Sequence, residues 1–296
     1  MEGESITSIE YKNRWVPELF VSSGTYCITL LMYPLLRSLS PFDTTLGNAA
    51  LLVSLLFVIP GAILVLWRNW EMWYVSFLAG FLGCCTSIGI QVATVGYDTR
   101  LFYLGCYIIA LSFFHQSEYV TTALFNPHRL SLDSYILNHS REYHIAAVVS
   151  WTEYSLESWL APSLKTYHWL ALLGLVLVAS GEFLRKAAMF TARSNFSHIV
   201  AFRKRSDHEL VTHGVYSLSR HPAYMGWFYW SIGTQVLLCN PVCTVAYAAA
   251  SWSFFNERIE EEEIALLNFF GRHYVEYQQR VGTGLPFISG HLPRRE

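Results

Sequence analysis

The sequence is poor in charged residues. Asp, Glu, Lys and Arg make up 14% of its 296 residues, whereas 53% are hydrophobic and 16% are aromatic. A soluble domain carries about 25% charged residues. This deficit therefore indicates an integral membrane protein, which is embedded in the lipid bilayer. The formal net charge of −2 leaves no basic excess for phosphate groups, so we expect no nucleic-acid partner.

Metal-binding motifs and a disulfide framework are also missing. The chain has no HExxH motif and no Cys/His cluster with zinc spacing, so we predict no metal site. Its six cysteines lie inside or at the edge of apolar runs, as small buried hydrophobic residues do. Cys239 and Cys243 flank Asn240-Pro241, but spacing alone does not establish disulfide geometry, and we expect them to remain unpaired.

A signal peptide is not apparent either. Residues 1–18 contain four Glu, one Lys and one Arg, without a small-residue cleavage site. The first apolar run is therefore expected to remain as a membrane helix. A spanning helix needs about 20 mostly apolar residues. The clear candidates are Leu19–Leu36, Leu46–Trp67, Met72–Val95, Leu101–Phe125, Tyr167–Phe190, Pro222–Cys239 and Val242–Phe255.

A further segment, Tyr135–Leu160, is more polar but has an apolar stripe at helical spacing. It either spans the membrane with its polar face against protein or a wet cavity, or it lies in the interface. We favour a span, which gives an all-α polytopic membrane protein of about eight transmembrane helices. The polar residues of this segment include Arg141, Glu142, His144, Glu153 and Glu157.

Lys and Arg residues orient such a chain, because cytoplasmic loops carry an excess of them. With eight spans and a cytosolic N-terminus, only Arg37, Arg100 and Lys165 of the 20 basic residues fall on the far side. Both termini are then cytosolic. The sequons at Asn138 and Asn195 lie on or near the cytosolic side, where we expect no glycan.

The chain divides by composition into two parts. Residues 1–192 form a hydrophobic transmembrane body, which is the side expected to meet a lipid substrate. Residues 193–296 contain a polar connector, a tight helical hairpin about Asn240-Pro241, and a charged cytosolic tail. No convincing internal repeat is present, which disfavours a transporter built from inverted halves.

The polar connector ends in a pattern suited to anion binding. Gly214 permits a sharp turn, and Pro222 suits the first turn of a helix. The free amides at that helix start bind carboxylate or phosphate, and Arg220 and His221 stand beside them. The alternative is a basic loop at the membrane edge that pairs with lipid head groups.

A second polar cluster runs from Arg258 to Glu263. Successive residues of an α-helix step about 100°, so four consecutive Glu residues cannot all meet one ligand. Arg258 and Glu262 are four residues apart and share a face. A solvated helix end with an intrahelical ion pair is the simplest interpretation, and it suits Glu260, Glu261 and Glu263. It suits Arg258 less well, because Arg258 follows an apolar run within three residues.

The C-terminal third contains these residues within an ordered set. The set comprises Leu210-Val211, Gly214, Tyr216, Arg220-His221-Pro222, Tyr224, Gly226, Arg258, Glu262-Glu263, Leu266, Phe270-Gly271, Tyr274, Tyr277 and Pro286. It resembles the signature of the isoprenylcysteine carboxyl methyltransferase family. No single piece is rare, but the order is specific. Tyr229–Gln235 and Thr283–Phe287 look like the eukaryotic branch, which has eight spans.

The resemblance implies transfer of a methyl group from S-adenosylmethionine to the C-terminal carboxylate of a prenylated cysteine, giving a methyl ester. It implies prenylated CaaX-processed proteins such as small GTPases as partners, and the endoplasmic reticulum membrane as the location. Arg258 matches the arginine that orients the substrate carboxylate in the family. Near Ala201 the chain departs from the family pattern, so no contact is assigned there. The cofactor-binding residues carried over are His208, Glu209, Leu210, Val211, Tyr216, His221, Pro222, Ala223, Tyr224 and Glu262.

The chemistry of this transfer needs positioning more than acid–base catalysis. A C-terminal carboxylate, with a pKa of about 3.5, is already ionised at pH 7 and needs no general base. Orientation alone supplies roughly 7–11 kcal/mol, and Arg258 can hold a carboxylate by two oxygens. Helix-start amides suit the cofactor's carboxylate, and Glu262 suits its ammonium group. Tyr216 and Tyr224 either pack on the adenine or are ordinary interface tyrosines.

The hydrophobic body is expected to admit the prenyl chain from the bilayer through an opening between helices. The polar face of Tyr135–Leu160 is a candidate wall of that opening, or it is buried against other helices. Two other functions remain open. An NADPH-dependent membrane sterol reductase carries similar elements, but no Arg pair is set aside for a 2′-phosphate. A transporter or scaffold is disfavoured by the sparse intramembrane charge.

Overall fold

The computed structural model consists of helices and loops. No strand occurs among the residues that it describes. The contacts divide the chain into two compact units, Met1–Ser140 and Arg141–Glu296, which are described separately. The described residues are 16–39, 56, 58–64, 68–96, 100–138, 140–206 and 208–291.

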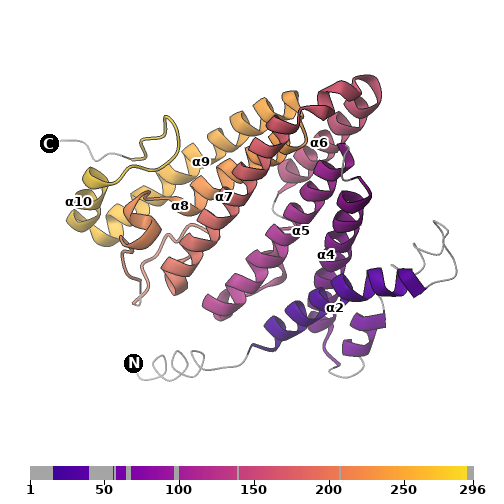
Figure 1. Ribbon diagram of the computed structural model, residues 1–296. Coiled ribbons are helices and arrows are strands. Elements are labelled where there is room, and N and C mark those ends of the chain that lie inside the picture. Colours follow the sequence, from indigo (N-terminus) through magenta and orange to yellow (C-terminus); the bar gives the residue numbers. More distant parts are fainter. Residues whose placement is uncertain are drawn as a thin grey trace. The chain divides into compact units, whose positions relative to one another are not determined.

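The described residues of the first unit include the long helices α2 (Pro17–Leu39), α4 (Trp70–Val95) and α5 (Arg100–Phe125) (Figure 1). Helix α4 packs against both α2 and α5. Polar side chains join them: Ser22 hydrogen-bonds Tyr135 at 2.9 Å and Gln116 donates to Ser22 at 2.9 Å. Such hydrogen bonds between helices are common in membrane bundles, which lack a hydrophobic force between helices.

The expected helices are confirmed where the structure describes them. Within the described residues, Pro17–Leu36 and Trp70–Val95 are long and apolar enough to cross a membrane by themselves. The span expected at Leu46–Trp67 lies largely outside the described residues, and the count of eight stays a prediction.

The second unit is built on the helices α7 to α9. Helix α7 (His168–Ala192) packs along α8 (Pro222–Leu237), and α8 packs against α9 (Pro241–Phe270) (Figure 1). Proline at the first position of both α8 and α9 fits the helix start, where no amide donor is needed. Gly271, with a φ of +52°, separates α9 from α10 (Arg272–Arg280).

Close backbone contact explains why α7 and α8 pack so tightly. A Cβ atom on Gly181 would lie 2.6 Å from the Gly226 carbonyl oxygen, and one on Gly226 would lie 2.6 Å from the Gly181 oxygen. Only glycine allows this reciprocal approach. The division expected after residue 192 therefore falls inside the second unit, because α7, assigned by composition to the hydrophobic body, packs on α8.

The segment Tyr135–Leu160 is helical from Arg141 rather than from Tyr135. Residues Leu132–Tyr135 form a 3₁₀ turn, and Ile136 has a φ of +57°, which a right-handed helix does not continue. The helix α6 (Arg141–Leu160) belongs to the second unit.

The polar face of α6 contacts the turn between α8 and α9. Ser150 donates to Gln235 at 2.8 Å, and the Glu153 carboxylate accepts from the amides of Val242 and Cys243 at 2.8 and 2.7 Å. A carboxylate at these first amides caps α9. This part of the polar face is thus buried against other helices. Of the two roles considered for the polar face, a cavity wall or burial against helices, this part has the second.

Lys165 closes the same turn. Its ammonium group pairs with Glu157 at 2.7 Å and donates to the carbonyl oxygens of Leu238 and Cys239 and to Asn240 Oδ1 at 3.0, 2.9 and 2.7 Å. The residue is 3% exposed. A cation here satisfies carbonyl groups that the end of α8 leaves without helical partners. All six cysteines are free, including Cys239 beside this turn.

Candidate functional site

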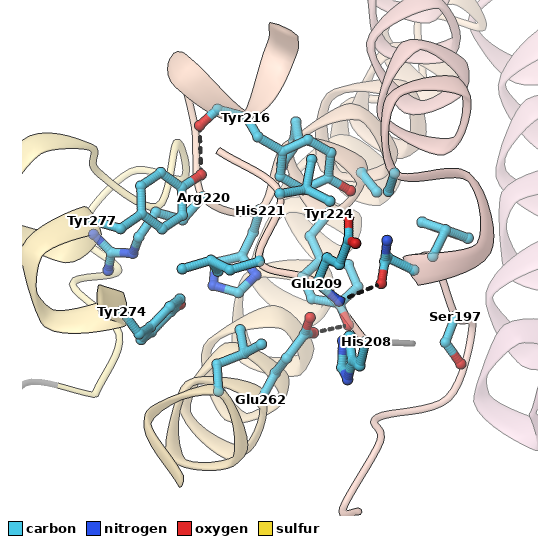
Figure 2. A pocket seen from close by; sticks show the side chains of 18 residues that line it. Ser197, His208, Glu209, Tyr216, Arg220, His221, Tyr224, Glu262, Tyr274 and Tyr277 are labelled. Atoms are coloured by element: carbon cyan, nitrogen blue, oxygen red, sulfur yellow. Dashed lines mark hydrogen bonds between the residues drawn. The ribbon is translucent and has the colours of Figure 1, made fainter. Parts of the chain in front are cut away.

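A cavity lies where the connector between α7 and α8 meets the ends of α9 and α10. It has a volume of about 660 Å³, including its open mouth. Figure 2 shows side chains from these segments pointing toward one another. The lining residues are Ala192, Asn195, Phe196, Ser197, His208, Glu209, Leu210, Val211, Tyr216, Arg220, His221, Pro222, Ala223, Tyr224, Glu262, Leu266, Tyr274 and Tyr277.

The structure brings together all ten residues that the sequence assigned to cofactor binding. Each of them lines this one cavity, although they come from the connector, the start of α8 and the C-terminal third of α9. Of the other lining residues, Leu266, Tyr274 and Tyr277 belong to the ordered motif but had no assigned role, and Arg220 was placed beside the anion-binding helix start without being counted among the cofactor residues. Asn195, Phe196 and Ser197 carried no functional signal in the sequence beyond a sequon.

The connector is held in place by hydrogen bonds at several points. The Glu209 amide donates to Asn195 Oδ1 at 2.9 Å, and Tyr277 donates to the Tyr216 carbonyl oxygen at 2.5 Å. Gly214 has a φ of +59° and begins the 3₁₀ turn Gly214–Ser217, which contains Tyr216. The cavity wall is therefore shaped by fixed backbone positions rather than by a free loop.

The start of α8 lies at the cavity. Pro222 is the first helical residue and His221 precedes it. Pro222, Ala223 and Tyr224 all line the cavity. Because the first amides of a helix have no partner within the helix, this end favours an anionic group. The sequence expectation of a helix start at the site is confirmed.

Arg258 does not line the cavity but contacts a residue that does. Its Nε donates to the Tyr224 hydroxyl at 3.3 Å, and its Nη2 donates to the His198 carbonyl oxygen at 2.6 Å. The Tyr224 hydroxyl in turn donates to Glu262 Oε2 at 2.5 Å. Arg258 and Glu262 are therefore joined through Tyr224, rather than forming the isolated ion pair that a solvated helix end would have.

Tyr224 is held by ring contacts as well. Its ring stacks on His221, with centroids 5.6 Å apart and an interplanar angle of 7°, and on Phe255 at 5.3 Å and 29°. The hydroxyl that joins Arg258 to Glu262 is thus carried by a ring with little freedom.

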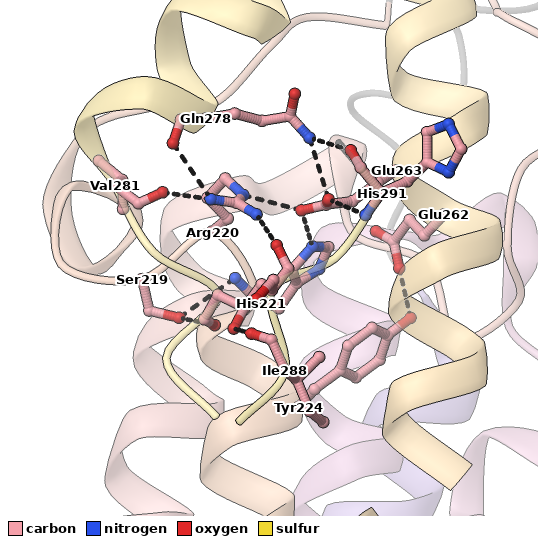
Figure 3. A network of polar contacts seen from close by, with 12 residues as sticks. Ser219, Arg220, His221, Tyr224, Glu262, Glu263, Gln278, Val281, Ile288 and His291 are labelled. Atoms are coloured by element: carbon pink, nitrogen blue, oxygen red, sulfur yellow. Dashed lines mark hydrogen bonds and ion pairs between the residues drawn. The ribbon is translucent and has the colours of Figure 1, made fainter. Parts of the chain in front are cut away.

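Glu263 corrects the sequence interpretation. It was expected on a solvated face, but its side chain is fully buried. Two loops and α10 fold over this side of α9, which a helical wheel of α9 alone does not show. Five donors surround the carboxylate, and Figure 3 labels Arg220, His221, Gln278 and His291 among them. They are Arg220 Nε at 2.7 Å, His221 Nε2 at 3.1 Å, the Tyr274 hydroxyl at 3.1 Å, Gln278 Nε2 at 3.0 Å and the His291 amide at 2.8 Å.

These donors control the protonation state of Glu263. Burial alone would raise its pKa, but hydrogen bonds and charges from His221 and Arg220 outweigh burial and lower the pKa to about 2. Burial and the charge of Glu262 raise the pKa of Tyr216, and burial raises the pKa of Tyr277 to about 12. At neutral pH the carboxylate is therefore ionised and both tyrosines are neutral donors, not bases.

No group of three or more His, Cys, Asp or Glu side chains in the described part of the chain is arranged to hold a metal ion. The candidate chemistry rests on Arg258, Glu262, the helix-start amides of α8 and the tyrosine rings of the cavity.

Comparison with known proteins places these residues in a family context. The model of the "Isoprenylcysteine carboxyl methyltransferase (ICMT) family" matches residues 172–268. The chain is 49% identical over 273 residues to protein-S-isoprenylcysteine O-methyltransferase of Xenopus laevis, covering 91% of this chain and 94% of the relative. It is 54% identical over 214 residues to the Homo sapiens protein of that name, covering 72% and 73%.

A solved structure is similar over nearly the whole chain. It is described as the eukaryotic intramembrane Ras methyltransferase ICMT without a monobody. The TM-score is 0.88 at 40% sequence identity, covering 94% of this chain and 100% of the other. The Saccharomyces cerevisiae protein-S-isoprenylcysteine O-methyltransferase is 46% identical over 188 residues, covering 62% of this chain and 79% of the relative.

Proposed function

Because the chain belongs to the isoprenylcysteine carboxyl methyltransferase family, we propose that it methylates the C-terminal carboxylate of a prenylated cysteine. The methyl donor is S-adenosylmethionine, and the product is a methyl ester. The observation that carries this proposal is the single cavity lined by all ten residues carried over for the cofactor, with Arg258 one hydrogen bond away. The comparisons support a methyltransferase and not the sterol reductase.

The residues of the cavity fit S-adenosylmethionine chemically. The amides at the start of α8 suit the carboxylate of its amino acid end, and the carboxyl group of Glu262 suits the ammonium group. Tyr216 and Tyr224 both line the cavity, and Tyr216 is better placed to pack on the adenine because the Tyr224 ring already stacks on His221 and Phe255. When bound, this cofactor supplies a methyl group on a positively charged sulfur.

Arg258 is the residue proposed to hold the acceptor. The Nε and Nη2 atoms of its guanidinium group bond Tyr224 and His198, and among the described residues no hydrogen bond engages Nη1. That nitrogen remains to donate to a substrate carboxylate, which stays ionised without a general base. Tyr224 fixes the arginine relative to Glu262, so acceptor and donor sites share one rigid contact.

Tighter binding of the substrate carboxylate by Arg258 does not by itself increase the rate. Negative charge on the carboxylate is neutralised as the methyl group is transferred, so binding the ground state more tightly does not by itself speed the chemical step. Arg258 therefore contributes mainly by aligning the carboxylate with the methyl group, away from bulk water.

The rest of the chain is proposed to serve the membrane-embedded end of the substrate. Residues 1–192 form the lipid-facing body and residues 193–296 carry the cofactor site. The substrates are prenylated CaaX-processed proteins such as small GTPases, whose prenyl chain lies in the bilayer. We place the protein in the endoplasmic reticulum membrane, with about eight spans and both termini cytosolic.

One assay tests the proposal directly. The purified protein is incubated with S-adenosylmethionine labelled in the methyl group and a prenylcysteine acceptor, and base-labile ester is counted. Ester formation that needs the prenyl group is the expected result. A melting temperature raised by S-adenosylhomocysteine but not by NADPH is the companion result, since a ligand of the folded state stabilises it. A response to NADPH alone would favour the reductase.

A further inference from the structure

Glu263 does not line the cavity, yet it holds three residues that do. Arg220, His221 and Tyr274 all face the cavity, and all three donate hydrogen bonds to the Glu263 carboxylate. Figure 3 shows the contacts from Arg220 and His221. His221 donates from Nε2, so its ring orientation is fixed by Glu263. The same ring stacks on Tyr224. One buried carboxylate thus sets the positions of neighbouring parts of the cavity wall.

The C-terminal segment 282–291 folds back onto this carboxylate. Ser219 donates to the Thr283 carbonyl oxygen at 2.6 Å, and the Arg220 amide donates to the Gly282 oxygen at 2.9 Å. The segment is also pinned to the hairpin, because Trp252 Nε1 donates to the Pro286 oxygen at 2.8 Å. It ends with the His291 amide on Glu263.

Gly290 shows how closely the segment approaches Glu263. A Cβ atom on Gly290 would lie 2.1 Å from Glu263 Oε2, and Gly290 has a φ of +75°. A side chain there would have to displace the carboxylate. Gly282, at the other end of the segment, has open space where its Cβ would be.

We propose that Glu263 is a positioning residue for the methyl-donor site, and that segment 282–291 is a strap that keeps its carboxylate in place. The inference rests on the proposed function only in naming the ligand of the cavity. It assigns a role to two features outside the cavity, which act through Arg220, His221 and Tyr274.

The Glu263 carboxylate cannot be replaced by a neutral acceptor without loss of hydrogen bonds, and this makes the proposal testable. Glu263→Gln keeps the size of the side chain, but its amide has one acceptor oxygen and adds two N–H donors. Those donors would face Gln278 Nε2 and the His291 amide, which are themselves donors. Arg220 would also lose its only ionised partner among the described contacts.

The experiment measures S-adenosylhomocysteine binding by calorimetry in detergent-solubilised full-length protein. Glu263→Gln should raise the Kd about ten- to hundredfold, the loss expected for a hydrogen-bonded charge. Glu261→Gln, an exposed change on the same helix, should leave it within about twofold. The KM for the prenylcysteine acceptor should change far less than the KM for S-adenosylmethionine.

A second pair of variants changes the strap and so tests whether it holds the Glu263 carboxylate in place. Gly290→Ala should weaken S-adenosylhomocysteine binding in the same direction as Glu263→Gln, whereas Gly282→Ala should not. If either Glu263→Gln or Gly290→Ala lowers the melting temperature but binds S-adenosylhomocysteine normally, the network is structural support only and the proposal is overturned. Failure of the unchanged protein to bind S-adenosylhomocysteine would overturn the proposed function as well.

Discussion

Arg258 and Tyr224 lie 3.3 Å apart, joined by a hydrogen bond from the guanidinium Nε to the phenol oxygen. Tyr224 faces the candidate cofactor cavity and Arg258 does not. The contact therefore lies at the boundary between the place where the methyl donor is proposed to bind and the place where the acceptor carboxylate is proposed to lie. Changes on its two sides should affect different substrates.

Replacing Arg258 should abolish most methylation while leaving the methyl-donor site intact. Arg258→Ala removes a charged hydrogen bond worth about 2–5 kcal/mol, a factor of tens to thousands in rate. Arg258→Lys should rescue poorly, because a point-like ammonium does not reproduce the fork of a guanidinium group. Affinity for S-adenosylhomocysteine should stay within a few-fold.

The control for Arg258 is Arg272, an exposed arginine paired with Glu276 at 3.0 Å. Its side chain is 90% exposed, so Arg272→Ala should change neither kcat nor KM appreciably. Near-normal turnover in Arg258→Ala would refute its role in holding the acceptor.

Glu262→Ala should differ in kind from Arg258→Ala. Glu262 lines the cavity and accepts from Tyr224, so its loss should raise the KM for S-adenosylmethionine more than the KM for the acceptor. Steady-state kinetics with both substrates varied would separate the two constants. An effect confined to the acceptor KM would contradict the assignment of Glu262 to the methyl-donor site.

Acid should destabilise the protein through Glu263, which lies beyond the apolar run of α9. Its pKa is about 2 in the folded state against an ordinary value of 4.5, so the folded state binds fewer protons. Stability from this group is complete above about pH 4.5 and is lost as the pH falls toward about 2. The facing groups are Arg220, His221 and Tyr274.

Melting temperatures measured from pH 7 down to the acid limit of the detergent system would test this. The unchanged protein should lose stability in that window more steeply than Glu263→Gln, which has no proton to bind at this position. Parallel pH profiles for the two proteins would contradict the assignment.

Lys165 should matter for stability rather than for methylation. Removing it leaves the Glu157 carboxylate and the carbonyl oxygens of Leu238 and Cys239 without their cation. Lys165→Met should therefore cost about 3–5 kcal/mol, the usual penalty for breaking a buried pair. The double variant Lys165→Met/Glu157→Gln should recover part of the loss, as measured by denaturant or thermal unfolding.

Topology predicts the absence of two glycans. Asn138 and Asn195 should stay unglycosylated when the protein is made in the presence of microsomes, because both sequons are expected on or near the cytosolic side. Asn195 also accepts from the Glu209 amide at 2.9 Å, so a glycan there would be incompatible with the cavity wall. A glycan on Asn195 would contradict the proposed orientation and indicate that this segment lies on the opposite side of the membrane.

The sequence predicted the helices and the cavity lining because both depend on local or ordered signals. Apolar runs mark α2, α4, α5 and α7, and Pro222 marks the start of α8. The residues assigned to the cofactor follow in a fixed order along the C-terminal third, so a family resemblance identifies them without any knowledge of packing.

Glu263 was misjudged because its partners come from elsewhere in the chain. Arg220 and His221 are more than forty residues before it, and Gln278 and His291 follow it in other segments. A helical wheel of α9 contains none of these residues. The same limit applies to Glu153 on α6, whose partners are the first amides of α9. Polar residues on membrane helices are assigned correctly only when the facing segment is known.

The interlocked glycines of α7 and α8 affect how sequence variants of this protein should be interpreted. A Cβ on Gly174 would lie 2.1 Å from the Leu237 amide nitrogen, and one on Gly233 would lie 2.8 Å from that of Val178. Adding a single methyl group at Gly174, Gly181, Gly226 or Gly233 would wedge the helix pair apart. None of these four glycines lines the cavity, so a mutational scan would score them as damaging although they contact no ligand. Measured intolerance to substitution along this seam therefore reports helix spacing and not chemistry.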